Sequence, residues 1–91
     1  MVTAIIMLSV EKKFINQVAE QLASIEGLSE VYSVSGSYDI TAIARVQTND
    51  QLSELVTHHL AQIDNILKTE TMLAFRAYSK HDLEGMFSVG V

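Results

Sequence analysis

The chain has 91 residues, the length of one small domain, since chains usually form one domain for every ~100–200 residues. Hydrophobic residues make up 48% of the sequence, so the chain is expected to fold rather than stay disordered. A formal net charge of −5 without a Lys/Arg cluster argues against direct nucleic-acid binding, and the lack of Cys excludes disulfides and Cys-based zinc or redox sites.

The beginning of the chain predicts a strand followed by a helix. In Val2–Ser9, apolar residues occupy both faces, which is typical of a central strand that is covered on both sides. Lys12–Glu26 then carries apolar residues at helical spacing. Ser9 is a candidate cap for the start of this helix, and Gly27 is a candidate left-handed stop at its end.

A hairpin and a second helix are predicted next. Glu30–Ser35 and Tyr38–Val46 alternate as strands on either side of a tight turn at Gly36. Residues 48–51 (TNDQ) have the pattern of a capping box, in which the Thr hydroxyl accepts from the Gln amide and the Gln side chain reaches back. The helix that follows is predicted to run to Ile63.

The rest of the chain predicts one more strand and a tail. After Asn65, which tolerates a left-handed conformation, Ile66–Tyr78 reads as a long fourth strand and Ser79–Gly85 as a turn of helix. The order βαββαβ predicts an α+β, ferredoxin-like fold with a four-stranded antiparallel sheet, both helices on one face and the first and third strands central. Apolar residues on the other face of the sheet favour a partner, so we expect at least a dimer.

The histidines do not suggest a metal or catalytic site. His58 and His59 are adjacent, so on a helix they diverge by ~100° and cannot easily hold one ion together. His59 falls on the apolar stripe, and we interpret it as a histidine at the edge of the core. The residues around His81 contain the letters of a hydrolase triad but no nucleophile elbow. We therefore expect no catalytic residue, no metal and no cofactor.

Two polar features remain, a turn of sequence GSYD at residues 36–39 and a Thr-x-Thr pattern at residues 69–71 whose hydroxyls face one side of a strand. Both have ordinary explanations, because Gly permits the positive φ of a hairpin and Thr is a common strand residue. A free amino acid, on the other hand, needs an anion for its ammonium group and N–H donors for its carboxylate. Asp39 and the backbone of the turn can supply these groups. The candidate ligand-binding residues are Gly36, Ser37, Tyr38, Asp39, Thr69 and Thr71.

The order of these motifs resembles the effector-binding (RAM) domain of the Lrp/AsnC transcriptional regulators. The stretches MVTAIIML, VYSVSGSYDITAIARV and ILKTETMLAF carry the resemblance over residues 1–78, and the tail, residues 79–91, is similar to that of a subgroup of short members. The resemblance implies one domain over residues 1–91, of the dimeric α+β barrel type, whose dimers assemble into rings such as octamers or decamers. It also implies that the six candidate residues bind a small effector, typically an amino acid, between dimers.

Full regulators of that family carry a helix-turn-helix domain before this one, whereas here the first predicted strand begins at Val2. We therefore expect a protein without its own DNA-binding domain, which acts through co-assembly with full-length relatives or by sensing an effector. Family members often have a charged residue where this chain has Ser37, which leaves the identity of the effector open. No signal peptide and no run of ~18–20 apolar residues is present, so we expect a cytoplasmic protein that does not enter the membrane.

Two other classes share the order of strands and helices. A small monooxygenase-like enzyme of the dimeric α+β-barrel type would need a polar cavity with a His, Asn or Trp, and this chain has no Trp. An ACT-like regulatory module commonly has a glycine-bearing loop after the first strand, where this chain has SVEKK. The sequence thus favours a binding module over an enzyme.

Overall fold

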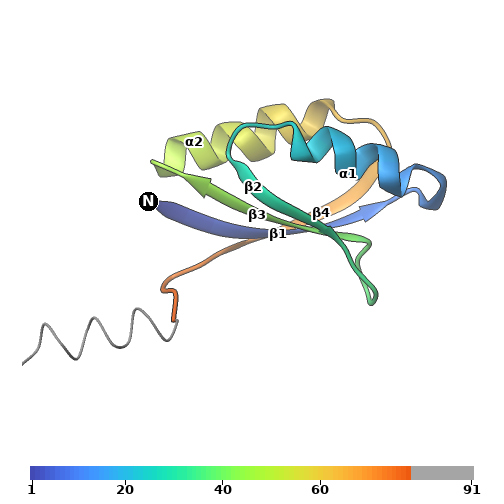
Figure 1. Cartoon of the computed structure of the whole chain (residues 1–91). Helices are drawn as coiled ribbons and strands as arrows, with labels where there is room; N and C mark the ends of the chain where they lie inside the picture. The colour runs from blue at the N-terminus through green and yellow to red at the C-terminus, as the bar shows by residue number, and fades with distance from the viewer. Residues whose placement is uncertain (79–91) are drawn as a thin grey trace, which may run out of the picture.

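The computed structural model describes residues 1–78 and shows a four-stranded antiparallel sheet with both helices on one face (Figure 1). The strands are β1 (Val2–Val10), β2 (Leu28–Ser33), β3 (Ile40–Val46) and β4 (Ile66–Leu73), in the order β2-β3-β1-β4. Helix α1 (Ile15–Ala23) follows β1 after a 3-10 turn, Lys12–Phe14, and helix α2 (Asn49–Glu54) follows β3. The predicted α+β, ferredoxin-like fold with β1 and β3 in the centre is confirmed.

The hydrophobic core lies between the sheet and the helices. Every second residue of β1 is buried, from Ala4 to Val10, and packs in one cluster with Val18 and Leu22 of α1. The residues between them point to the other side of the sheet and are half-buried. We call this other side the open face. It contains Ile5, Met7, Thr41, Ile43 and Met72, which lie opposite one another in the strand register.

The hairpin strands are shifted relative to the prediction. β2 covers Leu28–Ser33 instead of Glu30–Ser35, and β3 begins at Ile40 instead of Tyr38. Ile40 is the first residue of β3 that has a partner on each side, since it lies opposite Ser33 of β2 and Leu8 of β1. Residues before Ile40 therefore belong to the loop.

The fourth strand is shorter than predicted, because β4 ends at Leu73 rather than Tyr78. β4 is an edge strand that pairs with β1 alone. The last hydrogen bond between the two strands runs from the Ala74 N–H to the Thr3 carbonyl and is 2.9 Å long. Thr3 lies next to Val2, where β1 begins, so the residues that follow Ala74 have no neighbouring strand to hydrogen-bond with. The predicted turn of helix at residues 79–85 lies outside the described residues.

The helix ends confirm some of the predicted signals and contradict one. Gly27 and Asn65 have positive φ, 100° and 74°, as their positions after the two helical segments predicted. The prediction that Ser9 caps the first helix is wrong. Ser9 lies within β1, opposite Lys68, and no side chain caps the 3-10 turn or α1. Among residues 1–78, no helix is long and apolar enough to cross a membrane.

The capping box at the start of α2 is present in a modified form. The Gln51 N–H donates to the Thr48 hydroxyl at 3.1 Å, as predicted. The Gln51 side-chain oxygen accepts from the N–H of Gln47, at 2.7 Å, rather than from that of Thr48.

The second helical segment changes type along its length, which the sequence did not predict. After α2 come a π-turn, Leu55–His59, and a 3-10 turn, Leu60–Gln62. In an α-helix, residues five apart point ~140° away from each other. Here the Leu60 N–H donates to the Leu55 carbonyl, five residues back, and this wider turn buries both leucines. His59 is left exposed, so the interpretation of His59 as a core-edge residue is wrong.

Candidate functional site

The loop Val34–Asp39 joins β2 to β3 and contains the GSYD sequence. A hydrogen bond of 2.9 Å from the Val34 N–H to the Asp39 carbonyl closes it. Gly36 at its tip has φ 125°, a conformation that side-chain-bearing residues rarely adopt. No atom lies within 4 Å of the place where a Cβ on Gly36 would be, so the tip is open to solvent.

Asp39 anchors this loop to the end of β1. Its N–H donates to the Leu8 carbonyl at 2.9 Å, and its Oδ2 accepts from the Val10 N–H at 2.8 Å. Val10 lies beyond the last residue that pairs with β3, at a point where the register with β4 also shifts. The carboxylate therefore satisfies an N–H that the sheet leaves unpaired, while its second oxygen has no protein partner among residues 1–78.

Tyr38 connects the loop to the edge strand on the other side of β1. Its hydroxyl donates to Glu70 Oε2 at 2.8 Å, and Lys68 Nζ lies 5.8 Å from the centre of its ring. The hydrogen bond to Glu70 raises the pKa of Tyr38 above its ordinary value of 10.0. Lys68 and Glu70 lie opposite Ser9 and Met7, which places this cluster on the open face of the sheet.

The two threonines lie on the other side of the same strand. Thr69 is opposite Leu8 and Thr71 is opposite Ile6, both core residues, so the threonines face the helix side of the sheet. They are nevertheless exposed, since β4 is an edge strand. A single chain thus brings the four loop residues together but does not surround one cavity with all six candidates.

Sequence reasoning missed Lys68 and Glu70, the two charged residues next to Tyr38. A signal for them was available, because residues on either side of Thr69 point to the opposite face of the strand. The open-face side of the loop is therefore bordered by one lysine and one carboxylate.

A second polar cluster lies on the open face at the opposite edge of the sheet, along β2. The Tyr32 hydroxyl donates to the Glu30 carboxylate, and Arg45 Nη1 lies 2.6 Å from Ser29 Oγ and 3.4 Å from Glu30 Oε1. The hydrogen bond from Tyr32, followed by that from Arg45, lowers the pKa of Glu30 below 4.5. The same contact with Glu30 raises the pKa of Tyr32 above 10.0.

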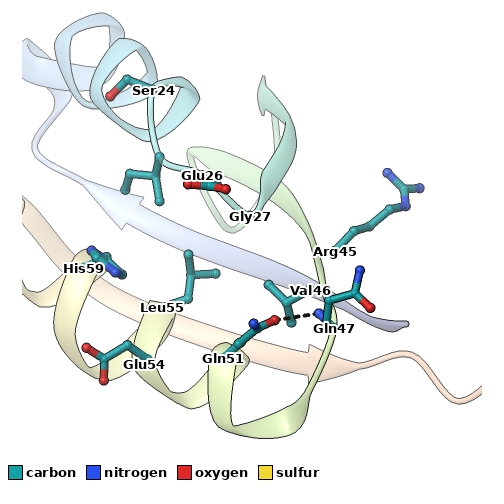
Figure 2. Close-up of a pocket in the computed structure, with 11 residues that line it drawn as sticks. Ser24, Glu26, Gly27, Arg45, Val46, Gln47, Gln51, Glu54, Leu55 and His59 are labelled. Atoms are coloured by element: carbon teal, nitrogen blue, oxygen red, sulfur yellow. Dashed lines mark hydrogen bonds between the residues drawn. The ribbon is translucent and has the colours of Figure 1, made fainter.

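The described part of the chain also contains a groove of about 740 Å³, shown in Figure 2. It lies at the other end of β3 from the loop Val34–Asp39, roughly 20 Å away for a strand of seven residues. Its lining includes none of the six candidate residues. Within residues 1–78, no group of three or more His, Cys, Asp or Glu side chains is placed to hold a metal ion.

Comparison with known proteins identifies the relatives of this fold. The family model described as the Lrp/AsnC ligand binding domain matches residues 3–83. The uncharacterized HTH-type transcriptional regulator PF0250 of Pyrococcus furiosus is 36% identical over 59 residues, which are 65% of this chain and 39% of the relative. The chain thus spans about two-fifths of the length of this curated relative.

Solved structures of known proteins show the same fold. The crystal structure of TTHA0845 from Thermus thermophilus is 34% identical, with a TM-score of 0.83 over 88% of this chain and 100% of that one. The complex of the regulator NMB0573 of Neisseria meningitidis with L-Met has a TM-score of 0.77 over 86% of this chain and 52% of that one. At 15% identity, the second likeness concerns the fold alone.

Proposed function

The chain belongs to the Lrp/AsnC ligand-binding domain family, and we propose that it binds an amino acid at the loop Val34–Asp39 and signals this binding through self-assembly. The family and the relatives of the chain are transcriptional regulators rather than enzymes, which supports a regulatory role for effector binding. The match to this family also favours this reading over the monooxygenase-like and ACT-like alternatives.

The charges around the loop are complementary to a zwitterion. Asp39 has an oxygen without a protein partner, and Glu70 lies beside Tyr38, so an ammonium group finds carboxylates there. Lys68 Nζ lies 5.8 Å from the centre of the Tyr38 ring and can pair with a carboxylate. Within the described part of the chain, the N–H groups of residues 36–38 have no acceptor and can also donate to a carboxylate. This arrangement is the observation that carries the proposal.

One solved structure with the same fold supports an amino acid as the ligand. The Neisseria meningitidis regulator was solved as a complex with L-Met, which is an amino acid. Thr69 and Thr71 lie on the other side of the edge strand and do not reach Tyr38 within one chain. Their proposed place in the ligand shell therefore requires a neighbouring subunit that brings a second loop to their side of β4.

Self-assembly is supported by the open face of the sheet. Ile5, Met7 and Ile43 are half-buried there, and Met72 is 44% exposed. A contiguous apolar surface of this kind marks an interaction site. We infer that two copies pair through these faces. Mixed assembly with full-length regulators is part of the same proposal, since the relatives of the chain are transcriptional regulators, and it predicts co-purification with a full-length relative from the same cell.

The test of the binding site uses two matched tyrosine variants. Tyr38 and Tyr32 each donate a hydrogen bond to a glutamate, but Tyr32 does so on β2, at the opposite edge of the sheet from Glu70. Removing the Tyr38 hydroxyl by Tyr38→Phe takes away the hydrogen bond that holds Glu70 in place beside the loop. Amino-acid binding is expected to weaken about tenfold, because the ligand must then order this carboxylate itself. Tyr32→Phe should leave the affinity unchanged in isothermal titration calorimetry. Equal affinities in all three proteins would remove the loop from the site.

A further inference from the structure

The groove at the opposite end of the sheet owes its shape to two local backbone features. Gly27, with φ 100°, lets the turn after α1 approach the sheet, and a Cβ there would lie 3.2 Å from Val46 Cγ1 and 3.5 Å from Leu55 Cδ1. Across the groove, the π-turn Leu55–His59 contributes Leu55 and His59 to the lining (Figure 2). π-turns are rare and occur frequently at functional sites.

The groove combines an apolar floor with an acidic rim. Ile25, Val46 and Leu55 are buried or half-buried and line its floor. The rim contains two exposed acidic residues, Glu26 in the turn after α1 and Glu54 at the end of α2, and Figure 2 shows their carboxylates on opposite sides of Leu55. Neither carboxylate forms a hydrogen bond or an ion pair with any residue in the described range 1–78.

The basic residue of the lining is already engaged elsewhere. Arg45 donates to Ser29 and Glu30, and Figure 2 shows its side chain directed away from the groove. The Gln51 side-chain oxygen is likewise occupied by the Gln47 N–H. The charged side chains that remain for a ligand are those of Glu26 and Glu54, and the Gln47 amide and the His59 imidazole can add hydrogen bonds.

We propose that this groove binds a small organic dication with two ammonium groups on a short hydrocarbon chain, of which a linear diamine is the simplest example. One ammonium group donates to the Glu26 carboxylate and the other to the Glu54 carboxylate, and the hydrocarbon chain between them covers the floor. The volume of about 740 Å³ falls within the ~300–1,000 Å³ that ligand sites usually occupy. The site is separate from the loop Val34–Asp39, so it does not depend on the proposed amino-acid site.

The experiment measures binding of cadaverine, a linear diamine, to the assembled protein by isothermal titration calorimetry, with the neutral diol of equal length as the reference. The double variant Glu26→Gln/Glu54→Gln removes the rim charges. Glu11→Gln/Glu20→Gln removes the same charge from exposed positions outside the groove and serves as the matched control. Exposed ion pairs are individually weak, so the rim variant is expected to bind about tenfold more weakly.

The expected result is saturable binding of cadaverine to the wild-type protein, to the control variant and to Tyr38→Phe, with loss confined to the rim variant. Equal weakening in both double variants would mean non-specific attraction to net charge and would overturn the proposal. Equal binding of the diol would overturn it as well, since the ammonium group would then contribute nothing. Binding of Mn²⁺ or of a lysine-rich peptide at the rim without any binding of cadaverine would overturn the proposal and assign the rim to a metal ion or a protein partner.

Discussion

Replacing Asp39 by Ala removes the acceptor for the Val10 N–H, and the consequence can be worked out from the structure. The hydrogen bond is 2.8 Å long, partly buried, and joins the loop before β3 to the end of β1. Net contributions of hydrogen bonds to charged groups are ~1.5–3 kcal/mol, and we expect Asp39→Ala to lower the free energy of unfolding by about 2 kcal/mol. For a domain of this size, 1 kcal/mol corresponds to roughly 4–8 °C in Tm.

The assay is urea unfolding at fixed protein concentration, combined with hydrogen exchange of the Val10 amide. Asp39→Asn keeps an acceptor oxygen in place and should lose less than half as much stability. Asp64→Ala removes the same charge from an exposed residue and should change the free energy of unfolding little. If Asp39→Ala unfolds like the wild type and its Val10 amide exchanges no faster, the anchoring role assigned to this carboxylate is wrong.

Three further predictions concern other parts of the fold. Thr48→Ala removes the cap of α2 and should cost about 1 kcal/mol in urea unfolding, whereas an unchanged midpoint would show that the 3.1 Å contact is not stabilising. Met7→Glu places a charge in the middle of the open face and should convert the assembly to monomers in size-exclusion chromatography with light scattering; an intact dimer would argue against pairing through this face. The Glu30 carboxyl should titrate below 4.5 in NMR and closer to 4.5 in Tyr32→Phe, because the tyrosine hydroxyl favours the ionised form. Because folding lowers the pKa of Glu30, its ionised form stabilises the folded protein at pH values above 4.5. The difference in free energy of unfolding between the wild type and Tyr32→Phe should therefore vanish as the pH falls through the pKa of Glu30 in the folded protein.

The sequence predicted those parts of the fold that local patterns determine. Apolar residues on both faces of residues 2–9 identified a central strand, and Gly27 and Asn65 marked the ends of helical segments. It could not predict the end of β4, because that end depends on where its partner β1 runs out near Thr3. The π-turn was missed for a similar reason: the burial of both Leu55 and Leu60 is imposed by the core against the regular helical period.

The sequence predicted the candidate loop, but it did not predict the side chains that surround this loop in the fold. The GSYD sequence identified an exposed turn, but only the fold reveals that one Asp39 oxygen is used to hold the end of β1. Lys68 and Glu70 are ordinary exposed strand residues in the sequence, and they become neighbours of Tyr38 through the pairing of β1 with both β3 and β4. The groove was not predicted, since its lining comes from segments that are far apart along the chain.

The most direct test of the central claim is a thermal-shift screen of the wild-type chain against the twenty amino acids, at fixed protein concentration. A ligand that binds only the native state stabilises it by about 2.7 kcal/mol at a hundredfold excess over Kd, which is readily measured as a rise in Tm. We expect one or a few amino acids to raise the Tm, with the rise reduced in Tyr38→Phe and retained in Tyr32→Phe. A folded, assembled protein whose Tm does not respond to any amino acid would contradict the proposed sensing function.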